Sequence, residues 1–278
     1  MRLIQHAALL IFIHVPNRIP IDDNIPSLHV AEHDMTQAAL VLVCKRPAPG
    51  VGKQRLAIRL GPDIAYQIAE ALLACALEDV IAWPGKVVIA PANAHDCAWA
   101  ANLFKQNHNK QTLTEAQVLP QTDGNLGQRL NALDHALRAN GLKQLIYIGS
   151  DAPDIDLADL TTASRMLSDF DSVLKPTLDG GVSIMASRKP WPDMTDLPWS
   201  TSQLGESLSL LCQKHGHSVA RLSEGFDVDE LEDLSYLAMR LAQDQRPARQ
   251  ALCKLAQQII QMKTLRQKVM SKTGTRYV

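Results

Sequence analysis

The chain has 278 residues, 46% of them hydrophobic, which is enough to bury the core of one large domain or of two small ones. Its formal net charge of −1 gives no general reason to expect a nucleic-acid-binding protein. The five cysteines are scattered and contain no C-x-x-C pair, so neither a disulfide framework nor a zinc ribbon is indicated. A reducing, cytoplasmic location fits best.

The amino-terminal segment, residues 1–34, differs from the rest of the chain. An apolar run near its start resembles the core of a signal peptide, but His6 and His14 interrupt it and no A-x-A-like cleavage site follows. We expect Met35 to be the natural start and residues 1–34 to be an extension. A membrane anchor is the alternative.

Residues 38–44 are continuously apolar, which predicts a central strand of a parallel sheet. The Pro- and Gly-rich loop that follows, from Lys45 to Pro62, contains five cations and no acidic residue. Its glycines allow the backbone to approach a phosphate closely, although the loop matches neither a P-loop nor a dinucleotide-binding fingerprint. We predict that the nucleotide-binding residues here are Lys45, Gly50, Lys53 and Arg55. The alternative is a solvated basic loop.

The next elements alternate between helix and strand. A helix is predicted from Pro62 to about Ile81, a strand at 87–90, a helix at 96–106 capped by Asp96, and a short strand at 117–119. A second Gly-bearing turn then leads into a helix that stops near Gly141. The start of that helix carries Arg129 and could hold an anion, so Arg129 is a predicted nucleotide-binding residue. The family resemblance described below adds Gln121 and Gly127 to the predicted nucleotide-binding residues.

The segment L-I-Y-I-G-S-D-A-P-D, residues 145–154, is the centre of the predicted site. Its apolar start predicts a buried strand, and Asp151 follows where the strand ends. Ligands of open α/β sheets bind at that edge, so Asp151 is a candidate catalytic and metal-binding residue. The alternative is that Asp151 or Asp154 only caps the helix that follows.

Further candidates lie in the second half of the chain. Strands are predicted at 172–176 and 182–187, and the turn between them contains Asp179 before two glycines, which could lie flat against a ligand or form a plain hairpin. A Pro- and Trp-rich stretch that contains Trp199, Ser200 and Thr201 is predicted to be an ordered lid or an acceptor loop. Asp227 and Asp229 alternate along an extended segment, so their carboxylates face the same side and would repel each other unless a cation lies between them.

The carboxyl-terminal segment, residues 245–278, is basic. It contains four Lys, four Arg and no acidic residue, which leaves about −9 on the rest of the chain. Residues 248–262 have the apolar spacing of a helix. The helix either packs on the body with a frayed basic end or attaches to an anionic membrane surface.

Together these motifs resemble a family, the small bacterial glycosyltransferase-A-like proteins of the selenodomain-associated type, and more distantly the molybdenum-cofactor and 2-phospholactate guanylyltransferases. The similarity covers about residues 38–242 and rests on K-x-P-x-P-G-x-x-K-x-R-L, P-Q-x-G-x-L-G-x-R, G-x-D-x-P, D-G-G, W-S-T and D-V-D-x-x-E-D-L. Gln54, Val182, Glu230 and Leu231 depart from the family pattern.

The resemblance implies an α/β fold, a three-layer glycosyltransferase-A-like sandwich with a mostly parallel mixed sheet, over residues 35–244. It implies transfer of a sugar from a nucleotide-diphosphate donor to an unknown acceptor. Mg²⁺ or Mn²⁺ would be held by Asp151, Asp227 and Asp229, and Asp179 would orient the acceptor. The alternatives are a nucleotidyltransferase and a non-catalytic protein that binds nucleotide sugars.

Overall fold

A computed structural model describes residues 37–103 and 116–272, with side chains up to residue 265. Residues 1–36, which include the predicted extension 1–34, lie outside the described part. The strands are β1 (Ala39–Cys44), β2 (Val87–Pro91), β3 (Gln117–Val118), β4 (Leu145–Ile148), β5 (Ser172–Pro176), β6 (Val182–Ser187) and β7 (Val219–Arg221). The helices are α1 (Gln54–Leu60), α2 (Pro62–Ala82), α3 (Cys97–Asn102), α4 (Leu126–Ala139), α5 (Leu157–Met166), α6 (Leu204–Lys214), α7 (Leu231–Arg240) and α8 (Pro247–Lys272).

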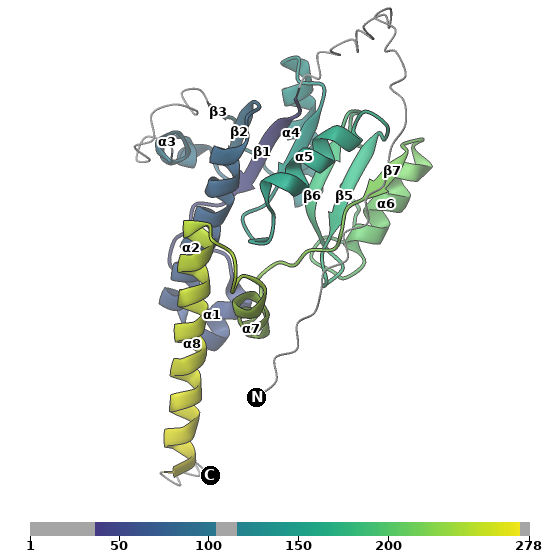
Figure 1. The fold of residues 1–278 in the computed structure, drawn as a ribbon. Coiled ribbons are helices and arrows are strands. Elements are labelled where there is room, and N and C mark those ends of the chain that lie inside the picture. The colour runs from purple at the N-terminus through teal and green to yellow at the C-terminus, as the bar shows by residue number, and fades with distance from the viewer. Residues whose placement is uncertain (1–36, 104–115, 273–278) are drawn as a thin grey trace, which may run out of the picture. The chain divides into compact units, whose positions relative to one another are not determined.

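One seven-stranded sheet organises this part of the chain, in the order β3-β2-β1-β4-β6-β5-β7 (Figure 1). All strand pairs are parallel except those of β6, which runs antiparallel to β4 and β5. The predicted mixed, mostly parallel sheet is therefore confirmed. From β1 the chain proceeds outward to β2 and β3 and then returns to the other side of β1 as β4. Ligands of open α/β sheets bind at such a reversal of strand order.

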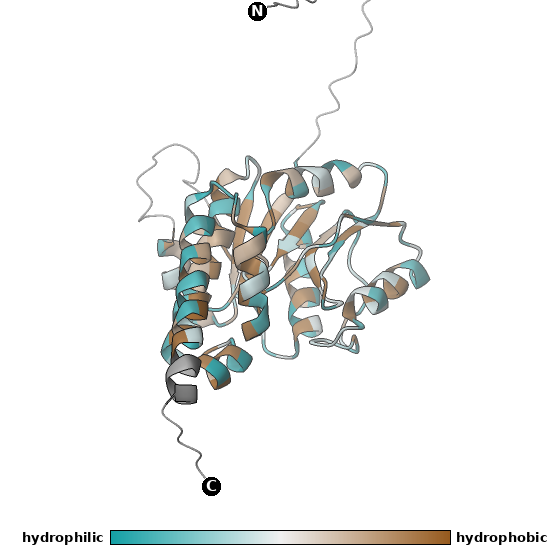
Figure 2. Cartoon of the chain, turned by 60° about the horizontal axis from the view of Figure 1, so that its bottom comes forward, coloured by the Kyte–Doolittle hydropathy of each residue, from teal (hydrophilic) through white to brown (hydrophobic). Residues whose placement is uncertain are grey.

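Helices cover both faces of the sheet because the side chains of a strand alternate between the faces. Leu40 and Leu42 of β1 pack with α2, α3 and α5, whereas Ala39 and Val41 pack with α4 and α6. Figure 2 shows the apolar residues of the helices turned toward the strands. This arrangement is the predicted three-layer sandwich.

A third apolar cluster lies beside the sandwich and joins α1, α2, α7 and α8. The α8 residues Leu252, Ala256 and Ile259 are buried in it, while Met262 and Leu265 are exposed. The apolar face of the predicted basic helix is therefore covered by the chain's own body over its first half. Helix α8 belongs to the same compact unit as the sheet. In the described ranges, no helix has both the length and the apolar character needed to cross a lipid bilayer.

Three details of the predicted secondary structure were wrong. The basic loop was predicted to continue to Pro62, but α1 begins at Gln54 inside it because Lys53 adopts a left-handed conformation that starts the helix. The helix predicted from Asp96 ends at Asn102, and Asp96 makes no capping hydrogen bond. The cap of α5 is Asp156, which accepts a hydrogen bond from the Asp159 amide at 2.8 Å, so neither Asp151 nor Asp154 caps that helix.

Candidate functional site

A cavity of about 600 Å³ opens where β1 and β4 end, at the reversal of strand order. The basic loop after β1, the Asp151 loop after β4, the β5–β6 turn and the segment 226–229 each contribute residues to its wall. Among the predicted site residues, those that line the cavity are Lys45, Lys53, Arg55, Gln121, Arg129, Asp151, Asp179, Trp199, Ser200, Thr201, Asp227 and Asp229. The tertiary structure thus brings together motifs that are up to 184 residues apart in the chain, from Lys45 to Asp229.

Two predicted residues, Gly50 and Gly127, are not part of this wall. A Cβ on Gly127 would lie 2.1 Å from the Met194 carbonyl oxygen, so this glycine allows α4 to pack against the loop that precedes Trp199. Gly50 has a φ of 77° in the turn of the basic loop, a conformation that favours glycine. Gly127 is therefore required for close packing, and Gly50 for the backbone conformation of the turn.

Lys53 is the central cation of the cavity. Its Nζ lies 2.8 Å from Asp151 Oδ1 and 2.9 Å from Asp229 Oδ1, and it donates to the Val228 carbonyl at 2.5 Å. Burial alone would lower the pKa of Lys53, but the two carboxylates outweigh burial and raise it. The lysine therefore stays charged and joins the basic loop, the Asp151 loop and the segment 226–229.

The sequence indicated that a cation should lie between Asp227 and Asp229. In the structure the nearby cation is Lys53, which contacts Asp229. Asp227 has no such partner within hydrogen-bonding distance among the described contacts. Burial, followed by the neighbouring charges of Asp179 and Asp229, raises the pKa of Asp227 to about 7. The site thus carries more negative charge than Lys53 balances, which is an environment that favours an additional cation.

Asp179 is held rigidly by the turn that carries it. Its Oδ1 accepts hydrogen bonds from the Thr177 hydroxyl at 2.5 Å and from the Gly181 amide at 2.9 Å. A Cβ on Gly180 would lie 2.0 Å from the Ser202 carbonyl oxygen, so the glycine pair allows the turn to pack against the chain's own acceptor loop. Of the two alternatives for this turn, close packing of Gly180 against Ser202 is the one that the described contacts account for.

Trp199, Ser200 and Thr201 of the predicted acceptor loop line the cavity. The Trp199 indole donates to the Met194 carbonyl at 3.0 Å, and the Thr201 hydroxyl donates to the Pro198 carbonyl at 2.7 Å. Ser200 lies between them with a φ of 63°, a left-handed conformation that is costly for a residue other than glycine. The loop is therefore held in one conformation by its own contacts.

Two polar groups of the wall have unsatisfied hydrogen-bonding atoms. Gln121 donates through Nε2 to the Ala90 carbonyl at 2.7 Å, which leaves its buried Oε1 without a partner. Arg129 has a buried Nε without a partner. Because buried polar atoms are normally paired, an acceptor at Gln121 and a donor at Arg129 are available to a bound ligand.

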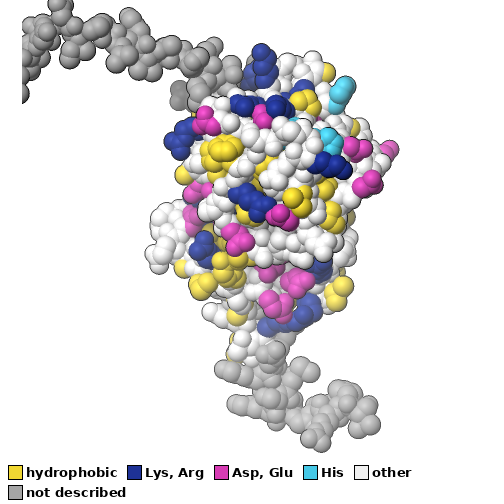
Figure 3. Space-filling model, turned by 90° about the vertical axis from the view of Figure 1, so that its right-hand side faces the viewer, with side chains coloured by type: hydrophobic (Ala, Val, Ile, Leu, Met, Phe, Trp, Pro, Cys, Tyr) yellow, Lys and Arg dark blue, Asp and Glu magenta, His cyan; other side chains and the backbone are white. Residues whose placement is uncertain are grey.

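The cations of the wall differ in how they are engaged. Arg55 lies 3.4 Å from Glu230, and Arg46 lies 3.8 Å from Asp96, both with exposed guanidinium groups. Arg46, Thr177 and Tyr147 line the cavity but were missed as candidates by sequence reasoning. Arg46 directly follows the predicted Lys45, whereas Tyr147 lay within a run read only as buried strand. Figure 3 shows another face of the molecule, on which basic and acidic side chains are interspersed.

A divalent metal ion is implied by the family resemblance. In the described part of the chain, no group of three or more His, Cys, Asp or Glu side chains is arranged to hold a metal ion, so the predicted set of Asp151, Asp227 and Asp229 does not form such a group. Mg²⁺ in nucleotide sites, however, is commonly bound by one or two carboxylates together with substrate phosphates and water. The excess negative charge around Asp151, Asp227 and Asp229 fits a metal that binds together with the nucleotide.

Comparisons with known proteins support the fold. Residues 72–201 match the family described as "Uncharacterized protein conserved in bacteria (DUF2064)". A solved structure of a candidate nucleotide-diphospho-sugar transferase from Desulfovibrio desulfuricans G20 is 21% identical, with a TM-score of 0.69 over 81% of this chain and 97% of that chain. This likeness confirms the predicted nucleotide-diphospho-sugar transferase fold. The comparison with curated proteins gives no match.

Two further solved structures are less similar. A cytidylyltransferase from Leptospira borgpetersenii serovar Hardjo-bovis is 12% identical, with a TM-score of 0.49 over 87% of this chain and 100% of that chain. The manganese complex of Rv0371C from Mycobacterium tuberculosis H37Rv is 18% identical, with a TM-score of 0.42 over 72% of this chain and 97% of that chain.

Proposed function

We propose that this protein is a nucleotide-dependent transferase that moves a sugar from a nucleotide-diphosphate donor to an acceptor bound in the same cavity. The observation that carries the proposal is the meeting of the basic loop and the four carboxylates in one cavity of about 600 Å³ at the reversal of strand order. That volume is in the range of small-molecule sites. Cations along one part of the wall suit phosphate oxygens, and carboxylates along another suit a metal or acceptor hydroxyls.

The roles follow from how each side chain is engaged. The diphosphate would be bound by three cations of the cavity wall, Lys45, Arg46 and Arg129. Arg46 has an exposed ion pair with Asp96, and the described contacts contain no ion pair for Lys45 or Arg129. The unpartnered Oε1 of Gln121 would accept a hydrogen bond from the nucleobase of the nucleotide sugar. Asp179, which its turn holds in place, would orient an acceptor hydroxyl. Arg55 would reach the phosphates only after leaving Glu230.

Mg²⁺ or Mn²⁺ would be held by Asp151 with Asp229 or Asp227, and when bound it would stabilise the negative charge that develops on the departing nucleoside diphosphate. Lys53 would keep Asp151 and Asp229 within reach of one position, because its Nζ already contacts both. In the transfer step the bond between the anomeric carbon and the diphosphate oxygen breaks. A bond between the anomeric carbon and the acceptor oxygen forms, the nucleoside diphosphate leaves with the electron pair, and the proton of the acceptor hydroxyl passes to water or to the departing diphosphate.

Ligand binding tests the proposal first. Thermal unfolding is followed with a panel of nucleoside diphosphates, nucleoside triphosphates and nucleotide sugars, each with and without Mn²⁺. A ligand present at 100 times its dissociation constant stabilises the folded state by about 2.7 kcal/mol, which raises the Tm by roughly 5–10 °C. We expect such a shift for a nucleotide sugar in the presence of Mn²⁺, and we expect Asp151→Asn to abolish it.

Asp123→Asn is the matched control, because Asp123 is an exposed acid in the turn before α4 and does not line the cavity. This control should shift as the wild type does. Product analysis then identifies the reaction, since release of a nucleoside diphosphate indicates sugar transfer and release of pyrophosphate indicates nucleotidyl transfer. The absence of a shift with every ligand would overturn the proposal.

A further inference from the structure

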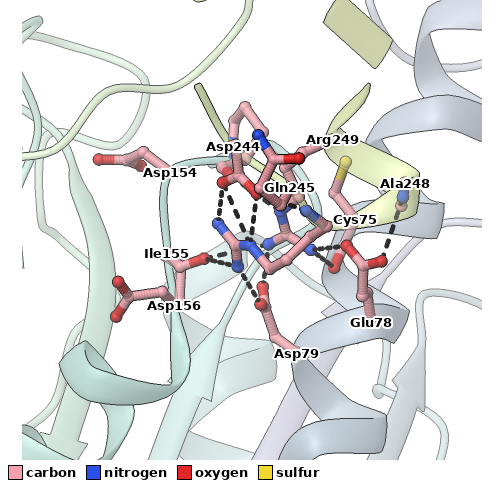
Figure 4. A network of polar contacts seen from close by, with 12 residues as sticks. Cys75, Glu78, Asp79, Asp154, Ile155, Asp156, Asp244, Gln245, Ala248 and Arg249 are labelled. Carbon is pink, nitrogen blue, oxygen red and sulfur yellow. Dashed lines mark hydrogen bonds and ion pairs between the residues drawn. The ribbon is translucent and has the colours of Figure 1, made fainter. Parts of the chain in front are cut away.

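Two arginines, Arg246 just before α8 and Arg249 in its first turn, donate to main-chain carbonyls of the segment that follows β4. Figure 4 shows Arg249 among its partners. The Arg249 side chain is completely buried. Its Nε donates to the Pro153 carbonyl at 3.1 Å and its Nη2 to the Ile155 carbonyl at 3.0 Å. Arg246 donates through Nη1 to the same Ile155 carbonyl at 2.8 Å. Both guanidinium groups thus bind main-chain oxygens of the segment between β4 and α5.

The remaining donors of Arg249 are bound by α2. Nη1 contacts the Cys75 carbonyl and lies 2.9 Å from Glu78 Oε2, and Nη2 contacts Asp79 Oδ2. Arginine offers its donors in a rigid planar arrangement, so contacts on several sides fix the orientation of the whole group. Arg249 thereby links the Pro153 and Ile155 carbonyls of the loop to α2, one of the helices that pack on the sheet.

Acidic partners make this buried cluster electrostatically tolerable. Arg246 Nη1 lies 2.9 Å from Asp79 Oδ1, and its Nη2 lies 2.7 Å from Asp244 Oδ2. A buried guanidinium is costly unless carboxylates offset its desolvation, and here three carboxylates, from Glu78, Asp79 and Asp244, surround two guanidinium groups. Lysine has one ammonium group in place of the planar arrangement and could not make the same set of contacts.

The same loop is held on its other side by the cavity residues. The Asp151 carbonyl accepts a hydrogen bond from the Val228 amide at 3.0 Å, and the Asp151 carboxylate contacts Lys53. Pro153 and Ile155, whose carbonyls accept the hydrogen bonds from the arginines, lie two and four residues after Asp151. A movement of the Pro153 and Ile155 carbonyls would therefore displace the Asp151 carboxylate from Lys53 and Asp229.

We infer that Arg249, assisted by Arg246, is a positioning residue that sets the place of the Asp151 carboxylate from outside the cavity. The consequence for catalysis rests on the proposed function, in which Asp151 holds the metal. Helix α8 would then help to position a residue of the site. Its first residue lies 46 positions beyond the end of the matched family segment, residues 72–201.

The alternative role for the arginines is to fasten α8 to the body. Leu252→Ala is the matched control, because Leu252 is fully buried in the cluster of α1, α2, α7 and α8 and lies three residues after Arg249. That substitution loosens α8 without removing a contact to the loop. The test variants Arg249→Lys and Arg246→Gln remove contacts to the loop. Because Arg246 is partly exposed, Arg246→Gln can be used if Arg249→Lys fails to fold.

Native-state amide hydrogen exchange distinguishes the two roles. The Ile155 amide, which donates to the Ala152 carbonyl, reports opening of the loop. The Leu40 amide, which donates to the Lys86 carbonyl in the central strand, reports global unfolding. We expect the ratio of the Ile155 rate to the Leu40 rate to rise about tenfold or more in Arg249→Lys, since hydrogen bonds from a charged donor are lost. The ratio should not rise in Leu252→Ala.

Equal ratios in the arginine variants and in Leu252→Ala would overturn the inference. The measurement needs neither metal nor nucleotide, so it stands apart from the thermal-shift panel that tests the proposed function. A second readout is the dissociation constant of Mn²⁺ alone, measured by electron paramagnetic resonance. If the wild type binds Mn²⁺, Arg249→Lys should weaken that binding and Leu252→Ala should not.

Discussion

Asp227 offers a sharp test of the electrostatics of the cavity. Burial and the charges of Asp179 and Asp229 raise its pKa from 3.8 to about 7. The folded chain therefore binds this proton more tightly than the unfolded chain does. It follows that the stability of the wild type falls as the pH rises from near 3.8 through about 7. Asp227→Asn removes the titrating group and should remove this loss.

The magnitude follows from the size of the shift. One pKa unit corresponds to about 1.4 kcal/mol, so the upper bound on the loss above neutral pH is on the order of 4 kcal/mol. Between pH 5 and pH 8, the unfolding free energy of Asp227→Asn relative to wild type should increase by about 1–3 kcal/mol, because solvent screening reduces the full value.

Urea unfolding of both proteins at pH 5 and pH 8, in buffer containing a chelator, measures this difference directly. Asp123→Asn serves as the control, since its side chain is exposed and lies outside the cavity wall. An unchanged difference between Asp227→Asn and wild type across the two pH values would refute the reasoning. In that case Asp227 would be solvated or paired, and burial with the charges of Asp179 and Asp229 would not raise its pKa as we infer.

Three further substitutions test local geometry by urea unfolding. Gly127→Ala should destabilise the fold by more than about 2 kcal/mol, because its Cβ would lie 2.1 Å from the Met194 oxygen; a loss under about 0.5 kcal/mol would contradict close packing there. Tyr147→Phe should cost about 1–3 kcal/mol, because the buried Tyr147 hydroxyl donates to Asp134 at 3.0 Å; a neutral effect would mean that Asp134 is otherwise satisfied. Ser200→Gly should stabilise the chain by about 1 kcal/mol through relief of the left-handed conformation, and a loss of stability would show that the serine side chain contributes more than its backbone strain costs.

The sequence by itself determined the sheet and the positions of the site motifs along the chain. Continuous apolar runs such as Leu145–Ile148 specify strands buried on both faces, and Gly149 directly after this run marks where the strand ends. Residues that follow parallel strands must meet at one edge of the sheet, so the basic loop and Asp151 could be placed together before the structure was known. The boundary at Gln54 was missed because Lys53 starts α1 from a left-handed conformation that no local pattern announces.

Only the tertiary structure decided which charges meet. Lys53 was read as a phosphate ligand, yet its ammonium group is bound by Asp151 and Asp229, residues separated from it by 98 and 176 positions. Arg249 was counted only among the cations of the carboxyl-terminal segment, yet it is buried and donates to the Pro153 carbonyl of the Asp151 loop. Periodicity and composition are local properties, whereas an ion pair depends on distances between segments that are set by the packing of the whole core. The sequence could therefore locate the charged residues of the site, and only the folded chain could assign their partners.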